Sequence, residues 1–574
     1  MPFAAALRKT FARPYDFAAF RADALAGLVV GVVALPLSMA LAIAVGVPPQ
    51  HGLYTAIVAG IVVALTGGSK FQVTGPTAAF VVVLAPIAAR EGLAGLLTAG
   101  LMAGVLLVGM GLARLGRLIQ FVPHPVTTGF TAGIALVIAT LQIKDVFALS
   151  IEHMPETYLE KVSALWRARA TASPDDFVVA AVTLALLLGL PRAFPNLTAK
   201  VPAPLVALSL VSAAVASIHT VLPRFEVATI GSRFHSVVGG HLVSGIPRVP
   251  PLPMLPWGAG GLSLGSLSHL GSAAFAIAML GAIESLLSAT IADGMTGKKH
   301  DPDAELVGLG LGNIVAPFFG GIAATGALAR TATNVRAGAR SPIASVVHAV
   351  TVLLAVLLFA PLVAYVPMAS LAALLLLVAW NMSEVRHFAN IVRVAPRGDV
   401  LVLIACFCLT VVFDMVVAVS FGVVLAALLF MRRTAELTRS RILDVNQGES
   451  ELQLVRGVVV YEIAGPLFFG AAQNAMGALG SVGADAQVVV LALGRVPSID
   501  ATGLVALESS LARLRAQKKL VVLAGPLPEP RSVFVRAEIG ERYDHVRFAD
   551  SLEQAVELAR SLIANGEDQL VPAV

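Results

Sequence analysis

Long apolar runs follow one another between residues 25 and 431, with short polar loops between most of them. A helix needs about 20 apolar residues to cross the hydrocarbon core of a bilayer, where every backbone polar group must find a partner within the protein. Only 13% of the residues are charged, about half of the share in an average soluble protein. The chain is therefore expected to be an α-helical membrane protein. We expect about fourteen membrane segments, at residues 25–46, 53–67, 77–89, 93–113, 124–142, 177–193, 203–222, 270–292, 306–320, 326–337, 342–360, 368–381, 399–413 and 415–431.

The lysines and arginines indicate the orientation of these segments. They account for the net charge of +5 and lie mostly in short loops on one side, for example at Lys298–Lys299 and Arg432–Arg433. The positive-inside rule then places both termini in the cytoplasm, with residues 1–24 as a cytoplasmic N-terminal segment that lacks a cleavable signal. Within it, Tyr15–Asp23 resembles an amphipathic segment at the membrane surface. Because the charges are dispersed in loops, no nucleic-acid partner is expected.

A polar stretch, Ala323–Gly338, lies between two strongly apolar segments and reads AATGALARTATNVRAG. It contains a cation, Arg330, an amide, Asn334, and a helix-weakening glycine, Gly326. Hydrocarbon tolerates a cation or irregular backbone only where protein or a water-filled cavity surrounds it. Membrane carriers bind their substrates at short, interrupted helices of this kind. We therefore expect a binding site in this stretch.

A second short segment repeats part of this pattern. Thr74–Phe80 reads TGPTAAF and Thr325–Arg330 reads TGALAR, and each Thr-Gly pair precedes the third segment of a set of seven. Because seven is an odd number, the second set enters the membrane with the opposite orientation. The sequence therefore predicts two inverted seven-segment repeats with half-helices that meet near the middle of the bilayer.

The amino ends of these two half-helices indicate anion binding. Helix N-termini carry unpaired N–H groups and a partial positive charge of about half a unit, and the two helices would begin near Thr77 and Ala327. Arg330 adds a full charge that can fork onto a carboxylate or a sulfate. The alternative is a buried arginine that pairs within the protein and holds the helices together.

Glu284 lies in an otherwise apolar segment, with Ser285 and Ser288 nearby. A charged carboxyl is costly in that setting, so it pairs, binds a cation or takes up a proton. Coupling of transport to a proton or another ion is one interpretation, and structural pairing with Arg330 is the other. Asp293 fits the membrane interface, and no role is assigned to Asp414.

The composition becomes polar near residue 432, where a second domain is expected over residues 433–574. Strand and helix patterns alternate there, which predicts a small α/β domain with a largely parallel sheet. Cys406 and Cys408 lie in an apolar run and are interpreted as small buried residues, and no metal site or disulfide framework is expected. The strands are expected at 454–463, 486–493 and 520–524, and the helices at 470–479, 503–518 and 551–564.

Several separated motifs resemble one known family. PPQHGLY (Pro48–Tyr54), TGGSKFQVTGPTA (Thr66–Ala78) and LARTATNVRAG (Leu328–Gly338) are similar to the SulP anion transporters, which include the prestin-like proteins. The C-terminal domain resembles the STAS module that follows the membrane part in that family. VALPLSMALA (Val33–Ala42) and DGMTGKKH (Asp293–His300), together with the Ser-Glu-Val run at 383–385, look closest to bacterial C4-dicarboxylate transporters of the DauA type.

The resemblance implies a transport domain over residues 25–432, in which segments 1–4 and 8–11 form a substrate-carrying core and segments 5–7 and 12–14 a gate. It also implies a homodimer in the bacterial inner membrane. Many relatives carry PQxMAYA, whereas this chain has Leu37 and Leu41 in place of the polar pair, which fits a larger, partly apolar ligand. The resemblance places the anion at Ser38, Met39, Thr77, Ala78, Ala79, Phe80, Glu284, Gly326, Ala327, Leu328 and Arg330.

In the STAS-like domain, VPSIDATGL (Val496–Leu504) resembles the loop that related anti-sigma antagonists phosphorylate, with Thr502 at the phosphoacceptor position. Phosphate beside a helix N-terminus is favourable, and a cytosolic protein partner would be implied. The alternative is a plain turn whose helix is capped by Asp500 or Thr502.

These observations predict a secondary active, elevator-like transporter of small organic anions, most consistent with C4-dicarboxylates, coupled to protons or sodium. The alternatives are a bicarbonate or sulfate transporter and an anion-responsive membrane sensor. No phosphate-binding loop or nucleophile motif is present in the sequence, so neither an enzyme nor a bound cofactor is expected.

Overall fold

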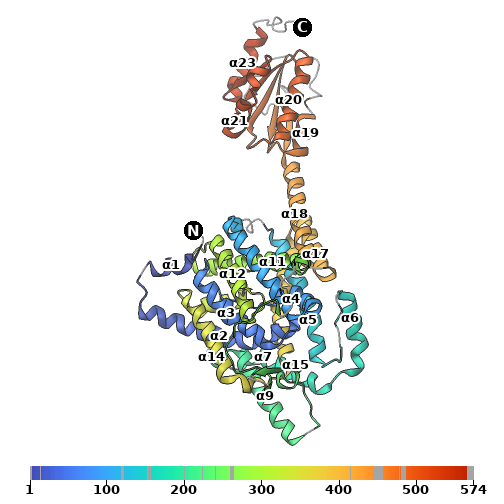
Figure 1. Ribbon diagram of the computed structural model, residues 1–574. Coiled ribbons are helices and arrows are strands. Elements are labelled where there is room, and N and C mark those ends of the chain that lie inside the picture. Colours follow the sequence, from blue (N-terminus) through green and yellow to red (C-terminus); the bar gives the residue numbers. More distant parts are fainter. Residues whose placement is uncertain are drawn as a thin grey trace. The chain divides into compact units, whose positions relative to one another are not determined.

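The computed structural model describes residues 3–12, 14–117, 122–151, 154–155, 157–198, 201–222, 224–238, 241–258, 261, 264–413, 415–443, 457–477, 479 and 486–564. The chain divides into two compact units, Met1–Ala426 and Ala427–Val574, which Figure 1 shows as a helical unit and a smaller mixed one. Asp414, to which the sequence assigned no role, lies outside the described residues.

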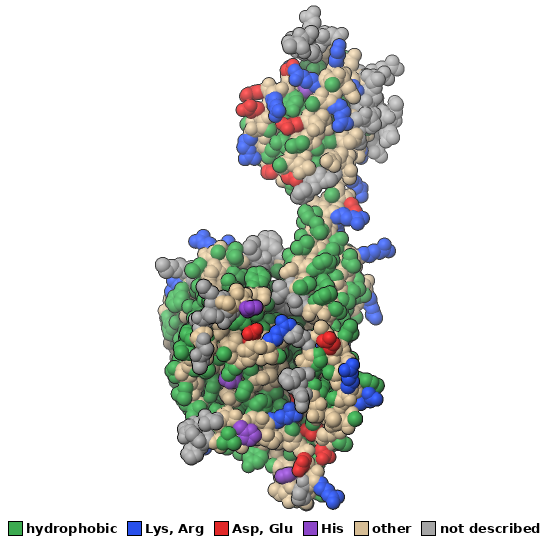
Figure 2. All heavy atoms as spheres, turned by 45° about the vertical axis from the view of Figure 1, so that its right-hand side comes forward, with side chains coloured by type: hydrophobic (Ala, Val, Ile, Leu, Met, Phe, Trp, Pro, Cys, Tyr) green, Lys and Arg blue, Asp and Glu red, His purple; other side chains and the backbone are tan. Residues whose placement is uncertain are grey.

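Ten helices among the described residues are long and apolar enough to cross a membrane. Hydrophobic side chains also predominate on the face of this unit that Figure 2 shows. The α-helical membrane domain predicted from the sequence is thereby confirmed. Nine of them lie in α2 (Phe17–Val45), α3 (Pro49–Thr66), α4 (Ala78–Leu112), α5 (His124–Val146), α7 (Pro174–Ala193), α9 (Ala203–Val221), α11 (Leu264–Thr296), α14 (Ile343–Val363) and α18 (Met415–Leu437), and the tenth, Met368–Val394, comprises α15 (Met368–Ser383) and α16 (Val385–Val394).

The remaining predicted segments correspond to shorter or interrupted helices. Segments 77–89 and 93–113 are the two parts of α4, which is broken at Gly92, where the backbone has a φ of 65°. Three more segments are α12 (Pro302–Val315), α13 (Leu328–Arg336) and α17 (Arg397–Val412). The other elements of this unit among the described residues are α1 (Ala5–Phe11), α6 (Tyr158–Arg167), α8 (Pro195–Thr198), α10 (Ile230–Arg233), the short 3-10 helices η2 (Ala168–Thr171) and η4 (Ala316–Phe319), the hairpin β2 (His235–Val238) and β3 (His241–Ser244), and the two-residue strands β1 (Thr74–Gly75) and β4 (Thr325–Gly326).

The first membrane helix starts earlier than expected. The sequence predicted a separate surface segment before residue 25, but α2 already begins at Phe17, because the Asp16 side chain accepts a hydrogen bond from Ala19 N and caps it. Phe17 and Phe20 remain exposed, at 78% and 45%. The amphipathic segment is therefore the first two turns of the membrane helix itself.

The helices of the membrane unit pack in two groups. In the first group α2 packs on α3 and α14, and α4 packs on α11 and α12; in the second, α5 packs on α15 and α17, and α7 on α9 and α15. Glycines permit close approach between α4 and α12 in the first group: a Cβ on Gly104 would lie 2.7 Å from Gly310 O, and one on Gly310 would lie 2.6 Å from Gly104 O. Small residues at such crossings let helix backbones touch.

The C-terminal unit contains a five-stranded sheet in the order β5-β6-β7-β8-β9, in which β5 is antiparallel to β6 and the other pairs are parallel. Helices α20 and α21 bury Leu511 and Phe534 on one side, whereas α23 buries Val556 in a separate apolar cluster. The predicted α/β domain is confirmed. Its elements are β5 (Arg439–Leu443), β6 (Val458–Ala464), α19 (Phe469–Gly477), β7 (Val488–Arg495), α20 (Ala501–Ala516), β8 (Leu520–Ala524), α21 (Pro528–Arg536), α22 (Ile539–Arg542), β9 (Val546–Ala549) and α23 (Leu552–Ala564).

The cysteines are not alike. Cys406 is buried in α17, as the sequence predicted, but Cys408 on the same helix is exposed. Two positions along a helix turn a side chain by about 200°, so the second thiol lies on the outer face. The prediction that both are buried was wrong for Cys408.

Candidate functional site

Two very short strands pair with each other inside the membrane unit, and we call this place the β1–β4 crossing. β1 (Thr74–Gly75) pairs with β4 (Thr325–Gly326) in antiparallel register, with Thr74 opposite Gly326 and Gly75 opposite Thr325. Each strand leads directly into a helix, since α4 begins at Ala78 and α13 at Leu328. A further bond, from Ala327 N to Val73 O at 2.8 Å, holds the second helix start against the first strand. The amino ends of α4 and α13 are therefore brought together by backbone pairing.

Neither helix start is capped by its own side chain. The N-cap residues are Thr77 and Ala327, and neither accepts a hydrogen bond from the first turn of its helix. The first N–H groups of a helix have no partner within it. They make the two helix starts suited to binding an anion.

Buried hydroxyl and amide groups hold this crossing in place. Ser285 of α11 accepts from Gly326 N at 2.8 Å, and Thr331 of α13 accepts from Val73 N at 3.1 Å. Asn313 of α12 accepts from Ala324 N at 2.8 Å and donates to Ala324 O at 2.9 Å. Irregular backbone at membrane depth needs such partners because hydrocarbon supplies none.

The Arg330 side chain lies against the β1–β4 crossing, next to Gly75, and is 1% exposed. Its Nη2 donates to Pro76 O, whereas Nε and Nη1 have no hydrogen-bond partner in the described part of the chain. A Cβ on Gly75 would lie 2.5 Å from Nη1, so the glycine gives the guanidinium its place. The arginine of the second repeat thus supports the strand of the first.

Glu284 does not pair with Arg330 among the described residues. Its Oε2 instead accepts a 2.8 Å hydrogen bond from Thr77 Oγ1. Glu284 and Thr77 are partly exposed, although Ser285 and Ser288 on the same helix are fully buried. The interpretation that Glu284 pairs with Arg330 is therefore not seen among the described residues, and a role of Glu284 in ion coupling stays a prediction.

The other predicted residues at the two helix starts differ in accessibility. Ala78, Ala79 and Phe80 are buried, and the Phe80 ring packs against α11 near Gly281. Leu328, the first residue of α13, is 42% exposed. Accessible space therefore adjoins the start of α13, whereas Phe80 serves as packing in this conformation.

α2 packs against both α4 and α13, but no hydrogen bond among the described residues joins its Ser38 or Met39 side chain to this cluster. Ser38 is fully buried, and its hydroxyl has no hydrogen-bond partner. Met39 lines a separate apolar pocket of about 750 Å³ together with side chains of α9 and α14, such as Leu208 and Phe359. Their contact with an anion stays a prediction.

The structure adds buried polar groups that the sequence analysis did not single out. Gln72 and Thr74 precede α4, and His348 lies on α14; both polar atoms of the Gln72 amide, the Thr74 hydroxyl and both ring nitrogens of His348 lack hydrogen-bond partners. For His348 a signal was available, because polar residues inside apolar segments are costly and mostly functional, whereas Gln72 and Thr74 lie in the loop between two predicted segments, where hydropathy gives no such signal.

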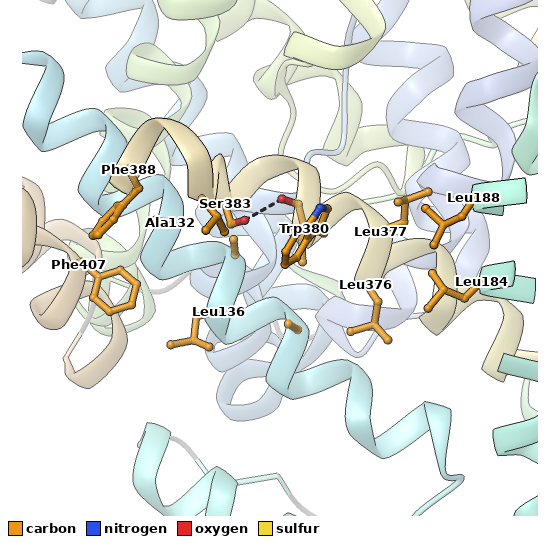
Figure 3. A pocket seen from close by; sticks show the side chains of 14 residues that line it. Ala132, Leu136, Leu184, Leu188, Leu376, Leu377, Trp380, Ser383, Phe388 and Phe407 are labelled. Carbon is orange, nitrogen blue, oxygen red and sulfur yellow. Dashed lines mark hydrogen bonds between the residues drawn. The ribbon is translucent and has the colours of Figure 1, made fainter. Parts of the chain in front are cut away.

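An apolar pocket of about 660 Å³ lies between α5, α7, α15, α16 and α17 (Figure 3). Leu136, Trp380 and Phe388 line it, and Trp380 is 68% exposed. Its hydroxyl group, from Ser383, already donates to Trp380 O at 2.7 Å, as the dashed line in Figure 3 shows. Because the described residues of its lining include no charged side chain, this pocket does not suit an anion.

In the C-terminal unit, Asp500 caps α20 by accepting from Gly503 N at 2.7 Å. Thr502 lies in the first turn and is exposed. The capping role therefore belongs to Asp500, as one interpretation of the sequence had it. Phosphorylation of Thr502 stays a prediction.

Comparison with known proteins adds a second line of evidence. Residues 20–406 match the model of the sulfate permease family, and residues 449–555 match that of the STAS domain. The chain is 40% identical over 541 residues to YvdB of Bacillus subtilis strain 168, whose name provisionally assigns it to sulfate transport; the match covers 93% of this chain and 97% of YvdB.

More distant similarities cover nearly the whole chain as well. The bicarbonate transporter BicA of Picosynechococcus is 27% identical, with 95% of both chains covered. The murine Slc26a9 anion transporter, solved in its inward-facing state, superposes with a TM-score of 0.83 over 97% of this chain and 94% of that one. At 16% identity, this last likeness concerns the fold alone.

Proposed function

The chain belongs to the sulfate permease (SulP) family of membrane anion transporters and carries the C-terminal STAS domain of that family, and from this premise we propose that it carries a small inorganic oxyanion, sulfate or bicarbonate. The proposed site lies between the amino ends of α4 and α13, beside Arg330 and Glu284.

The observation that carries this proposal is the pairing of β1 with β4, which joins two uncapped helix starts. Their partial charges attract an anion without requiring a cluster of cationic side chains. Arg330 supplies positive potential from behind the strands, and it has no carboxylate partner among the described residues to neutralise it. Positive potential without a fixed counter-charge favours an exchangeable anion.

Glu284 is the proposed site of ion coupling. Its carboxylate lies one hydrogen bond from Thr77, the residue before α4. A negative charge there repels an incoming anion, and a proton or a sodium ion removes that repulsion. Binding of the cation and binding of the anion would therefore favour each other, as symport requires.

The names of the relatives favour inorganic substrates, since they mention sulfate and bicarbonate. A C4-dicarboxylate is the second candidate. Leu328 supports it, because this exposed apolar side chain at the start of α13 offers a surface to a carbon chain, and Leu37 and Leu41 replace the polar pair of many relatives.

The two packing groups of the membrane unit suggest how such an anion would move. We expect α2, α3, α4 and α11–α14 to travel as the core, and α5, α7, α9, α15 and α17 to serve as the gate; α18 is assigned to the gate from the family resemblance alone. The site residues of β1, β4, α11 and α13 all belong to the core, so the anion would move with it. We further expect a homodimer in the bacterial inner membrane with both termini in the cytoplasm, and a cytosolic partner for the STAS domain.

Uptake into proteoliposomes tests this function. Labelled sulfate, bicarbonate and succinate are offered separately at several external pH values and with or without sodium. Saturable uptake of sulfate or bicarbonate, with succinate inactive, is the expected result. Uptake of succinate alone would show that the substrate is a C4-dicarboxylate and not sulfate or bicarbonate. Anion binding without net flux of any of the three would instead indicate a membrane sensor.

A further inference from the structure

A strongly basic cavity of about 460 Å³, distinct from the two apolar pockets, lies away from the β1–β4 crossing. Three parts of the chain form it: the end of α1, the loop between α3 and β1, and the end of α11 with the loop after it. Its lining residues are Lys9, Ala12, Gly68, Lys70, Phe71, Asp293, Lys298, Lys299 and His300.

Lysines are gathered here beyond what chance suggests. The chain contains nine lysines among its 40 basic residues, and four of the nine line this one cavity. Like charges this close repel one another unless an anion or water screens them. Three separate segments contribute these lysines, so the gathering is a product of the fold and not of one basic run.

The acidic groups around the cavity are already engaged. Asp293, the one carboxylate among the described lining residues, accepts from His300 N at 3.0 Å and lies 2.7 Å from His300 Nδ1. Behind the loop, Asp301 caps α12 by accepting from Ala304 N, and Glu305 accepts from Gly68 N and Ser69 N at 2.8 Å each. These carboxylates hold the walls in shape and leave the lysines in excess.

The walls are also held by the backbone. Ala4 N donates to Thr66 O at 2.7 Å, which fixes α1 against the end of α3. Lys70 Nζ donates to Lys9 O at 3.4 Å. The ammonium of Lys298 lies 5.2 Å from the centre of the Phe71 ring, a cation–π contact that orients it. The cavity is therefore formed before any ligand arrives.

We propose that this cavity is a second anion site, which takes a phosphate-bearing anion from the cytoplasmic side. Lysine ammonium groups are compact charges with rotatable donors, which suit a multivalent phosphate better than a planar monovalent anion. The anion comes either from a soluble phosphate compound or from the headgroup of an anionic lipid. The inference goes beyond the proposed transport site and does not depend on it.

A series of contacts connects the cavity to the proposed transport site. Phe71 forms part of its lining, and Phe71 O accepts a 2.8 Å hydrogen bond from Asn334 of α13. Thr74 of β1 follows three residues later. An occupied cavity therefore stabilises the segment that leads into β1 and its contact with α13.

Titration of the full-length protein with inorganic pyrophosphate tests the proposal, using calorimetry in phosphatidylcholine nanodiscs. Lys298→Gln/Lys299→Gln is expected to weaken binding about tenfold or more, because each lost charge-assisted bond is a strong one. Lys298→Arg/Lys299→Arg keeps the charge and is expected to bind within about threefold of wild type. Arg432→Gln/Arg433→Gln removes the same charge from an exposed pair elsewhere and should leave binding unchanged. Both lysines are exposed, so loss of folding is not expected, and the melting temperature verifies this.

Two further experiments show which site binds the pyrophosphate and whether the natural ligand is a soluble phosphate compound or a lipid headgroup. Arg330→Ala should retain pyrophosphate binding with at most a small change in affinity, because Arg330 does not line the cavity; complete loss of binding in a folded Arg330→Ala protein would assign the pyrophosphate to the transport site and overturn the proposal. Nanodiscs containing phosphatidylglycerol should weaken pyrophosphate binding by competition if the headgroup is the natural occupant, and should leave it unchanged if a soluble phosphate is. Wild-type protein that fails to bind pyrophosphate in phosphatidylcholine, or equal affinity in wild type and Lys298→Gln/Lys299→Gln, would refute the second site.

Discussion

Thr77 Oγ1 donates a hydrogen bond of 2.8 Å to Glu284 Oε2, and this single bond joins the start of α4 to the middle of α11. In many helices the hydroxyl of an N-cap threonine accepts from its own first turn. Here it serves a carboxylate on another helix instead, which leaves the first N–H groups of α4 for another partner. The bond therefore connects the proposed anion site with the proposed coupling site.

Thr77→Val is expected to weaken this connection while keeping the shape of the side chain. A hydrogen bond to a charged group contributes about 1.5–3 kcal/mol, so coupled uptake should fall about tenfold or more. Thr77→Ser retains the hydroxyl and should transport at a rate near that of wild type. Initial rates of anion uptake into proteoliposomes measure both. Equal rates for the valine and serine variants would show that the hydroxyl has no part in transport.

Arg330→Ala should abolish anion uptake, because it removes the buried positive charge behind the crossing. Gly75→Ala tests the position of that charge, since the added methyl would lie 2.5 Å from Arg330 Nη1 and must displace it. If both act through the guanidinium, the double variant should be no worse than Arg330→Ala alone. Anion affinity and uptake are measured for wild type, the two single variants and the double variant, and size-exclusion profiles verify that each is folded. Wild-type uptake by Arg330→Ala would remove this residue from the mechanism.

Sequence patterns predicted the helical segments well because each apolar run meets one strong requirement, burial of its backbone in hydrocarbon. The break at Gly92 and the start of α13 after Gly326 lie within a few residues of their predicted positions. The start of α2 was missed because Asp16 caps the helix before the apolar run begins. A local hydrogen bond of this kind is weakly encoded in hydropathy.

The site was harder to predict, because its contacts join residues that are far apart in sequence. The pairing of Thr74 with Gly326 and the bond between Thr77 and Glu284 each span more than 200 positions. Pairing of Arg330 with Glu284 was one interpretation of the sequence, but the described guanidinium donates to Pro76 O, directly after β1, instead. Composition identified which polar residues are costly in the membrane, and only the fold determined which of them meet.

The C-terminal unit offers a pH-dependent prediction that is independent of transport. His545 is buried, its Nε2 lies 3.0 Å from Leu511 O, and burial lowers its pKa below the ordinary value of 6.5. Below pH 6.5 the unfolded chain binds a proton at His545 that the folded domain does not bind. The contribution of His545 to the free energy of unfolding is therefore fully present above pH 6.5 and is lost as the pH decreases toward the lowered pKa.

A fragment of residues 436–574 should therefore melt at a lower temperature at pH 5.5 than at pH 7.5. His545→Gln keeps a donor for Leu511 O but cannot titrate in this range, so it should reduce the difference in melting temperature between these pH values. Melting followed by circular dichroism measures both proteins. An equal pH dependence in the two would assign the effect to other groups.

Glu284→Gln is expected to separate anion binding from ion coupling. The amide has nearly the same shape and can still accept a hydrogen bond from Thr77, but it can neither take up a proton nor bind sodium as a carboxylate does. Because the variant also lacks the negative charge that repels an anion, anion affinity should be unchanged or higher. Accumulation driven by a pH or sodium gradient should be lost, whereas exchange of labelled for unlabelled anion should continue.

Paired assays on the same proteoliposomes distinguish these outcomes. Gradient-driven uptake is measured against external pH with and without sodium, and anion exchange is measured with no gradient. Glu91→Gln, an exposed carboxylate that takes no part in the site, serves as the control for a lost negative charge and should leave both assays unchanged. If Glu284→Gln retained the wild-type dependence on pH and sodium, the coupling ion would have to bind elsewhere. The hydrogen bond from Thr77 would then be structural, and the Thr77→Val and Thr77→Ser variants would have to differ in stability and not in coupling.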